Sequence, residues 1–129
     1  MKPEKVTIKE IPFYGPYSTY VFINHFVFIS GQIGIDLKTG QLIYESISKE
    51  TKQVMENLKF ILSKRKLDFK SVIKSSIFIK NMNDFSKINE IYSSFFEKNQ
   101  YPARETIQVC GLPKNANIEI SMIAYENIP

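Results

Sequence analysis

Apolar residues in the first third of the chain form short runs typical of β-strands. Residues 19–23 and 26–29 are two runs of aromatic and β-branched residues, and only Asn24 and His25 separate them. Because asparagine tolerates the left-handed turn conformation, this spacing predicts a β-hairpin with His25 in an exposed turn. Gly31 lies in the strand-like run that follows, which predicts a β-bulge or a close approach to its backbone. A turn at 36–40 then precedes a short predicted strand at 41–43.

From Ile47 onward the pattern changes to the three- and four-residue spacing of an amphipathic helix. The recurring positions are 47, 51, 54, 58, 61 and 62, and they predict a helix that ends near Lys64. A second helix is predicted from Asn83 or Asp84, either of which is a suitable N-cap. Its apolar face would carry Phe85, Ile88, Tyr92, Phe95 and Phe96. Further strands are predicted at 71–80, 104–110 and 117–125.

The order of these elements predicts an α+β fold, with one mixed sheet covered by two helices on one face. In the last strand Ile118, Ile120, Met122 and Ala124 would point to one side, and Glu119, Ser121 and Ile123 to the other. The side away from the helices therefore mixes polar and apolar groups. Such a face on a short chain predicts burial against another subunit.

Length and composition are those of an ordinary globular domain. The chain has 129 residues, of which 43% are hydrophobic and 23% charged, so we expect a single domain over 1–129. Cys110 is the one cysteine, which makes an intrachain disulfide impossible and predicts a buried structural thiol in a reducing compartment. The apolar stretch at 20–29 is too short to span a membrane, and no targeting segment is visible. These features predict a cytoplasmic protein that does not bind membranes.

The net charge of +4 raises the question of a nucleic-acid partner. The excess comes from 15 lysines scattered along the chain, with only two arginines. The densest basic run, 64–66, falls at the predicted end of a helix, where it complements the helix dipole. Charge alone therefore does not favour a nucleic-acid partner, although it does not exclude one.

Candidate chemistry is confined to a few side chains. The sequence has no Gly-rich phosphate loop, no metal-ligand spacing of Cys or His, and no nucleophile elbow. Arg104 is notable in a chain that otherwise uses lysine, because only arginine can hold a carboxylate through two parallel hydrogen bonds. Glu119 is notable as a charge between Ile118 and Ile120 in a strand. Spacing leaves two interpretations open: a structural ion pair across neighbouring strands, or a binding site.

Several short motifs resemble one protein family in order and spacing. They are Gly15-Pro16-Tyr17-Ser18, Ser30-Gly31-Gln32-Ile33, Lys38-Thr39-Gly40, Val54-Met55-Glu56-Asn57-Leu58, Asn81-Met82-Asn83-Asp84-Phe85 with Asn89-Glu90-Ile91-Tyr92, Pro102-Ala103-Arg104, and Leu112-Pro113-Lys114 with Ile118-Glu119-Ile120. Together they resemble the reactive intermediate deaminase family, RidA/YjgF, also called L-PSP ribonucleases or translation-initiation inhibitors. The match runs from about Ile11 to Ala124.

The resemblance implies a chorismate-mutase-like fold that assembles into a homotrimer with clefts between subunits. It implies hydrolysis of 2-imino and 2-enamino acids, released by pyridoxal-phosphate enzymes, to 2-keto acids and ammonia, with no cofactor and no metal. In these roles Arg104 would clamp the substrate carboxylate and Glu119 would position or activate water. The implied substrate-binding residues, some from the neighbouring chain, are Tyr17, Ser30, Gly31, Asn89 and Thr106.

Three positions depart from the family pattern. Thr106 stands where many members have cysteine, Ser121 replaces a second glutamate, and the bulky Tyr14 precedes the Gly-Pro-Tyr motif. In the family the contact at the position of Thr106 is largely through the backbone, so the resemblance implies that threonine is tolerated, whereas Tyr14 would narrow the cleft. Two other functions stay open: an endoribonuclease or translation inhibitor acting on single-stranded RNA, and a non-catalytic trimer that binds a small ligand.

Overall fold

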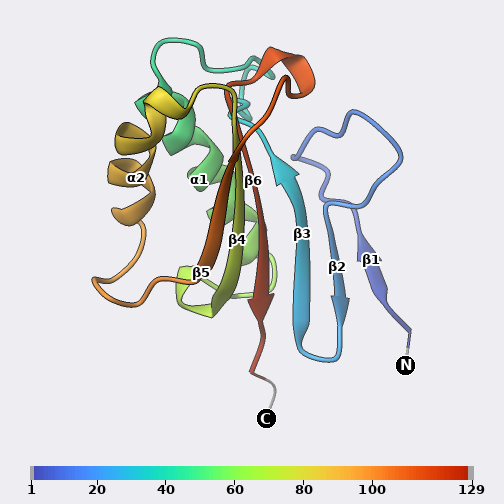
Figure 1. Ribbon diagram of the computed structural model, residues 1–129. Helices are drawn as coiled ribbons and strands as arrows, with labels where there is room; N and C mark the ends of the chain where they lie inside the picture. The colour runs from blue at the N-terminus through green and yellow to red at the C-terminus, as the bar shows by residue number, and fades with distance from the viewer. Residues whose placement is uncertain (1, 128–129) are drawn as a thin grey trace.

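Residues 2–127, which the computed structural model describes, form one six-stranded sheet with two helices packed against a single face (Figure 1). The strands are β1 (Glu4–Val6), β2 (Tyr20–Ile23), β3 (Phe26–Gln32), β4 (Val72–Ile79), β5 (Ala103–Gln108) and β6 (Ile118–Tyr125). The helices are α1 (Ile47–Ser63) and α2 (Phe85–Ser93), with short 3₁₀ turns η1 (Phe69–Ser71), η2 (Met82–Asp84) and η3 (Pro113–Asn115). The predicted α+β class is confirmed.

The last strand of the chain lies in the middle of the sheet. The order is β1-β2-β3-β6-β4-β5, and all neighbours are antiparallel except β4 and β5, which are parallel. This topology places Glu119 on a central strand and Arg104 on the edge strand β5. Strand β4 separates the two.

The core fills the space between the sheet and the helices. In β6 the four residues Ile118, Ile120, Met122 and Ala124 are buried, as the alternation predicts. They pack with the apolar face of α1, including Val54, Leu58 and Ile61. Burial of this face, rather than helix propensity, accounts for most of the stability of α1.

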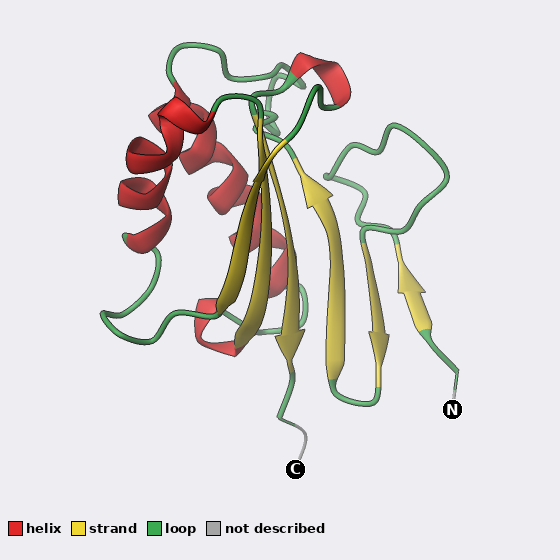
Figure 2. Cartoon of the chain, in the orientation of Figure 1, coloured by secondary structure: helices red, strands yellow, loops and turns green. Residues whose placement is uncertain are grey.

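The opposite face of the sheet bears no helix in the described part of the chain (Figure 2). Several large apolar side chains on it are exposed, namely Phe26, Phe28, Ile107 and Tyr125. The same face also carries polar groups: Nζ of Lys74 lies 3.0 Å from Oε1 of Glu105, and Ser76 and Ser121 lie next to Lys74. The mixture of polar and apolar groups predicted for this face is confirmed.

The structure departs from the predicted elements in several places. The strand expected at 41–43 is a single bridge between Leu42 and Ile35, and β1 was not predicted because only one of its three residues is apolar. Helix α2 ends at Ser93, before Phe95 and Phe96. The hydroxyls of Ser93 and Ser94 donate to the carbonyls of Glu90 and Ile91, which is typical of a helix that ends there.

Two single-residue predictions need correction. His25 occupies the predicted hairpin turn with a positive φ of 132°, but it is half-buried and stacks on Tyr125. Its Nδ1 lies 2.9 Å from the carbonyl oxygen of Glu126. The prediction of a buried Cys110 is wrong: β5 ends at Gln108, so Cys110 lies beyond the sheet and is exposed. No helix within residues 2–127 has the length and apolar character needed to cross a membrane.

Candidate active site

Glu119 lies on β6, on the face of the sheet away from the helices. It is in register with Phe78 of the neighbouring strand β4. The side chain is half-buried, and among residues 2–127 its carboxylate makes neither a hydrogen bond nor an ion pair. Burial raises the pKa of Glu119 because removal from water disfavours the charged form. A carboxylate whose pKa is raised in this way is a stronger proton acceptor than an exposed one.

The backbone of Gly31 forms the floor beneath the Glu119 carboxylate. Strand β3 is irregular here, because its register with β6 shifts between Ile29 and Gln32. A Cβ atom on residue 31 would lie 2.6 Å from Oε2 of Glu119. Both alternatives predicted for Gly31, a bulge and a close approach, are confirmed.

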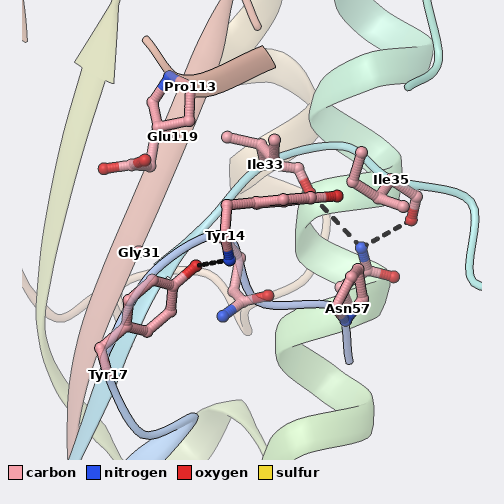
Figure 3. Close-up of a pocket in the computed structure, with 10 residues that line it drawn as sticks. Tyr14, Tyr17, Gly31, Ile33, Ile35, Asn57, Pro113 and Glu119 are labelled. Atoms are coloured by element: carbon pink, nitrogen blue, oxygen red, sulfur yellow. Dashed lines mark hydrogen bonds between the residues drawn. The ribbon is translucent and has the colours of Figure 1, made fainter. Parts of the chain in front are cut away.

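A small pocket opens beside Glu119 (Figure 3). Its volume of about 30 Å³ has room for roughly one water molecule. The lining residues are Pro12, Tyr14, Tyr17, Gly31, Gln32, Ile33, Ile35, Asn57, Pro113 and Glu119. Of the predicted site residues, the structure brings Tyr17, Gly31 and Glu119 together here.

Tyr14 lines this pocket next to Tyr17. Its backbone N–H donates to the hydroxyl of Tyr17 at 3.1 Å, and its ring lies against the ammonium of Lys114, 4.8 Å from Nζ to the ring centroid. Ser30 does not line the pocket. Its hydroxyl donates to the carbonyl of Ser18 at 2.7 Å, which holds the segment after Tyr17 against β3.

Two of the remaining predicted residues, Arg104 and Asn89, lie together near the edge strand. Arg104 and Asn89 line a cavity of about 300 Å³ between α2 and β5, together with Tyr92, Ser93, Tyr101 and Pro102. The guanidinium carbon of Arg104 lies 5.1 Å from the Tyr92 ring centroid. Within the described residues, Oδ1 of Asn89 and Oγ1 of Thr106 are buried without a hydrogen-bond partner. Such orphaned groups are costly unless a ligand or another chain completes them.

The structure does not bring Arg104 and Glu119 together within one chain. Arg104 is in register with Ser75, whose buried hydroxyl accepts from Tyr92 of α2, so Arg104 lies on the helix side of the sheet. Glu119 is in register with Phe78, three residues further along β4 and on the opposite side. The interpretation as an ion pair across neighbouring strands is therefore wrong.

Asn57 is a pocket residue that the sequence analysis did not single out. Its amide donates to the carbonyls of Ile33 and Ile35, at 3.4 Å and 2.8 Å. The sequence feature that could have identified Asn57 is its position as a polar residue on the apolar face of a predicted helix.

Within residues 2–127, no three Asp, Glu, His or Cys side chains lie close enough together to share a metal ion.

Comparison with known sequences assigns the family. The sequence model of the family described as Endoribonuclease L-PSP matches residues 7–126. The chain belongs to this family. The resemblance to RidA/YjgF proteins seen in the sequence is thereby confirmed.

Individual members of the family are similar over nearly their full length. A RutC family protein of Pyrococcus horikoshii is 45% identical over 87% of this chain and 88% of its own. The human protein named 2-iminobutanoate/2-iminopropanoate deaminase is 41% identical over 87% of this chain and 81% of its own. The crystal structure of Escherichia coli TdcF with bound serine has a TM-score of 0.88 and 35% identity, covering 96% of this chain and all of TdcF.

Proposed function

We propose that this protein hydrolyses 2-imino acids and their 2-enamino tautomers to 2-keto acids and ammonia. The observation that carries the proposal is Glu119, a half-buried carboxylate without a partner among residues 2–127, beside a pocket large enough for one water molecule. The human relative named as a deaminase and the serine bound to TdcF support a small amino-acid-like substrate.

The chemistry needs one base and one anchored electrophile. Glu119 accepts a proton from water while the water oxygen attacks the carbon of the protonated imine, which gives a neutral tetrahedral carbinolamine. Glu119 then returns that proton to the amine nitrogen, the C–N bond breaks and ammonia leaves, and the carbinolamine hydroxyl releases its own proton to solvent as the C=O bond forms. Proton transfer by a positioned carboxylate supplies about 10² to 10⁴-fold of rate.

Arg104 would hold the substrate carboxylate through its two-pronged guanidinium. Within one chain Arg104 and Glu119 cannot contact the same substrate molecule, because the two side chains lie on opposite sides of the sheet. We therefore infer a site between chains, with Glu119, Gly31 and Tyr17 from one chain and Arg104, Asn89 and Thr106 from its neighbour. The unpartnered Asn89 and Thr106 oxygens support this division.

The assembly that we propose is a homotrimer. A homodimer with a two-fold axis and a closed ring could both form such sites, and the exposed apolar face of the sheet, with Phe28 43% and Ile107 46% exposed, supplies a surface for either. The family resemblance favours the ring of three. Analytical ultracentrifugation that finds a monomer at micromolar concentration would contradict it.

The first test replaces each proposed group. Arg104→Ala should lower kcat/KM for 2-iminobutanoate by about 100-fold, since it removes a charge-assisted pair worth about 3 kcal/mol. Arg104→Lys keeps the charge without the fork and should recover part of the loss. Glu119→Gln should lower kcat by about 10² to 10⁴-fold. If Arg104→Ala deaminates like wild type, Arg104 is not part of the site.

A mixing experiment tests whether the site lies between chains. Arg104→Ala and Glu119→Gln chains are unfolded together and refolded at equal concentrations. If the two groups come from neighbouring chains in a ring, about a quarter of the sites in random mixtures regain both groups. If both come from one chain, no mixture exceeds the activity of the variants alone.

The same preparations address the alternative function. Cleavage of single-stranded RNA that survives repurification and is lost in Glu119→Gln would favour the endoribonuclease over the deaminase.

We also propose that the protein acts in the cytoplasm, because its exposed free thiol at Cys110 suits a reducing compartment.

A further inference from the structure

Helix α1 buries three polar side chains that the proposed reaction does not use. They are Glu50, Thr51 and Asn57, with exposures of 1%, 0% and 2%. Buried polar groups cost stability unless they are hydrogen-bonded, and apolar residues at these positions would pack without that cost. Two of the three side chains are bonded to segments that carry the pocket beside Glu119.

Asn57 fixes the chain where it leaves β3. Its Nδ2 donates to the carbonyls of Ile33 and Ile35 (Figure 3). Its Oδ1 accepts from Nε2 of Gln53 at 2.8 Å. Both carbonyls follow Gly31 within four residues. Because the β-bulge interrupts the regular pairing of β3 with β6 at this point, the helix supplies contacts that the sheet does not.

Glu50 fixes the chain where it enters β6. Its Oε2 accepts from the backbone N–H of Asn117 at 2.7 Å, and its Oε1 accepts from Nδ2 of Asn117 at 2.8 Å. Asn117 lies two residues before Glu119. Gly34 allows the helix to come this close, since a Cβ atom there would lie 2.8 Å from the carbonyl oxygen of Glu50.

We propose that Glu50 and Asn57 are positioning residues that hold the Glu119 carboxylate over Gly31. Both residues act from α1: Asn57 fixes the chain after the end of β3, and Glu50 fixes the chain before the start of β6. This inference rests on the proposed function for its catalytic consequence, but the contact itself can be measured without any reaction.

The kinetic test compares variants of α1 that keep or remove these bonds. Glu50→Leu and Asn57→Leu should lower kcat about 10- to 100-fold with KM changed less than about twofold, since a displaced base slows the reaction while Arg104 still binds the carboxylate. Glu50→Gln keeps one acceptor oxygen for the two donors of Asn117, so it should lose less kcat than Glu50→Leu. Thr51→Val is the matched control: it replaces a buried hydroxyl that has no partner within the described residues, and it should behave like wild type.

A second measurement is independent of activity. Burial against the sheet raises the pKa of Glu119, so loosening the strand ends should lower it toward its ordinary value in the leucine variants but not in Thr51→Val. Carbon-13 NMR titration of the Glu119 carboxyl measures this. The other titratable groups that line the pocket are Tyr14 and Tyr17, with Lys114 against the Tyr14 ring.

The outcomes separate the two proposals. Leucine variants that match Thr51→Val in kcat and in the titration of Glu119 overturn the positioning role. If a leucine variant does not fold, Gln53→Leu, which removes only the bond to Asn57, takes its place with a smaller expected loss. If the wild-type protein releases no keto acid, the proposed function fails, and the titration alone decides whether Glu50 and Asn57 hold Glu119.

Discussion

The contact between Gly31 and Glu119 is decided at the level of single atoms. Alanine at position 31 would put a Cβ 2.6 Å from the carboxylate, closer than real Cβ contacts, so Glu119 has to move. We expect Gly31→Ala to lower kcat about 100-fold, the effect of a displacement of about 1 Å at a reacting group. Gly111→Ala is the matched control, because a Cβ there meets nothing within 4 Å. Equal steady-state rates for the two variants would contradict the role of Gly31.

The raised pKa of Glu119 also predicts how stability depends on pH. At pH values between the unfolded and the folded pKa of Glu119, the folded protein binds more protons than the unfolded chain. The contribution of protonated Glu119 to stability is therefore present below the unfolded pKa and is lost as the pH rises through the folded pKa. Glu119→Gln, which carries no charge, should therefore be more stable than wild type at pH 7 and lose that advantage near pH 4. Urea denaturation at the two pH values measures the difference. An advantage that is larger at pH 4 has the wrong sign.

Residue types indicated three of the seven predicted site residues directly. Glu119 was visible as a charge between two isoleucines, Arg104 as a rare arginine, and Gly31 as a glycine inside a strand. Their separation was not visible, because it depends on β4 lying between β5 and β6. The roles of Tyr17, Asn89 and Thr106 came from family resemblance and stay predictions.

At the scale of elements, periodicity placed both helices and the longer strands within a few residues. Strand β1 escaped because Glu4-Lys5-Val6 has almost no apolar pattern and owes its conformation to pairing with β2. The insertion of β6 between β3 and β4 is equally invisible locally. It depends on contacts between distant parts of the chain, which no local pattern encodes.

The start of α1 gives a prediction about one element. Ser46 is its N-cap, and the hydroxyl accepts from the backbone N–H of Lys49 at 3.1 Å. Ser46→Ala should lower the free energy of unfolding by about 1 kcal/mol, the usual cost of losing a cap. Asp84→Ala is the comparison, since Asp84 precedes α2 without a side-chain cap bond and should cost less. Chemical denaturation followed by circular dichroism measures both, and a larger loss for Asp84→Ala would contradict the assignment.

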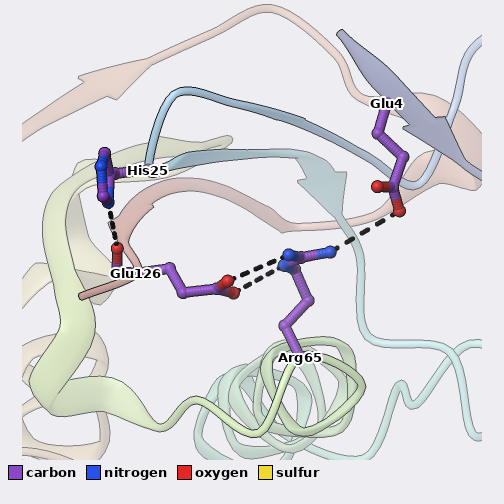
Figure 4. Close-up of polar contacts among 4 residues, drawn as sticks. All are labelled: Glu4, His25, Arg65 and Glu126. Carbon is purple, nitrogen blue, oxygen red and sulfur yellow. Dashed lines mark hydrogen bonds and ion pairs between the residues drawn. The ribbon is translucent and has the colours of Figure 1, made fainter. Parts of the chain in front are cut away.

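For the molecule as a whole, Arg65 joins segments from both ends of the chain (Figure 4). Its guanidinium donates to the Glu126 carboxylate at 2.7 Å and 3.0 Å, and it lies 3.6 Å from Glu4 of β1. The hydrogen bonds to Glu126 raise the pKa of Arg65 further above its usual value. The guanidinium also stacks 3.8 Å from the ring centroid of Phe22 on β2. One side chain after α1 thus ties the N-terminal strands to the segment that follows β6.

Removing this side chain should therefore weaken the whole fold. Arg65 and Glu126 are each only 18% exposed, so Arg65→Ala leaves a mostly buried carboxylate without a partner and should lower the free energy of unfolding by about 2 to 3 kcal/mol. Arg65→Lys keeps the charge but loses the paired bonds and the stacking, and should cost about half as much. Lys64→Ala is the matched control, because Lys64 meets Glu10 only at 3.9 Å on an exposed surface, a pair worth less than about 0.5 kcal/mol. All variants are compared by urea denaturation at one protein concentration, since unfolding of an oligomer depends on it. Losses of similar size for Lys64→Ala and Arg65→Ala would show that the two ends of the chain are held together elsewhere.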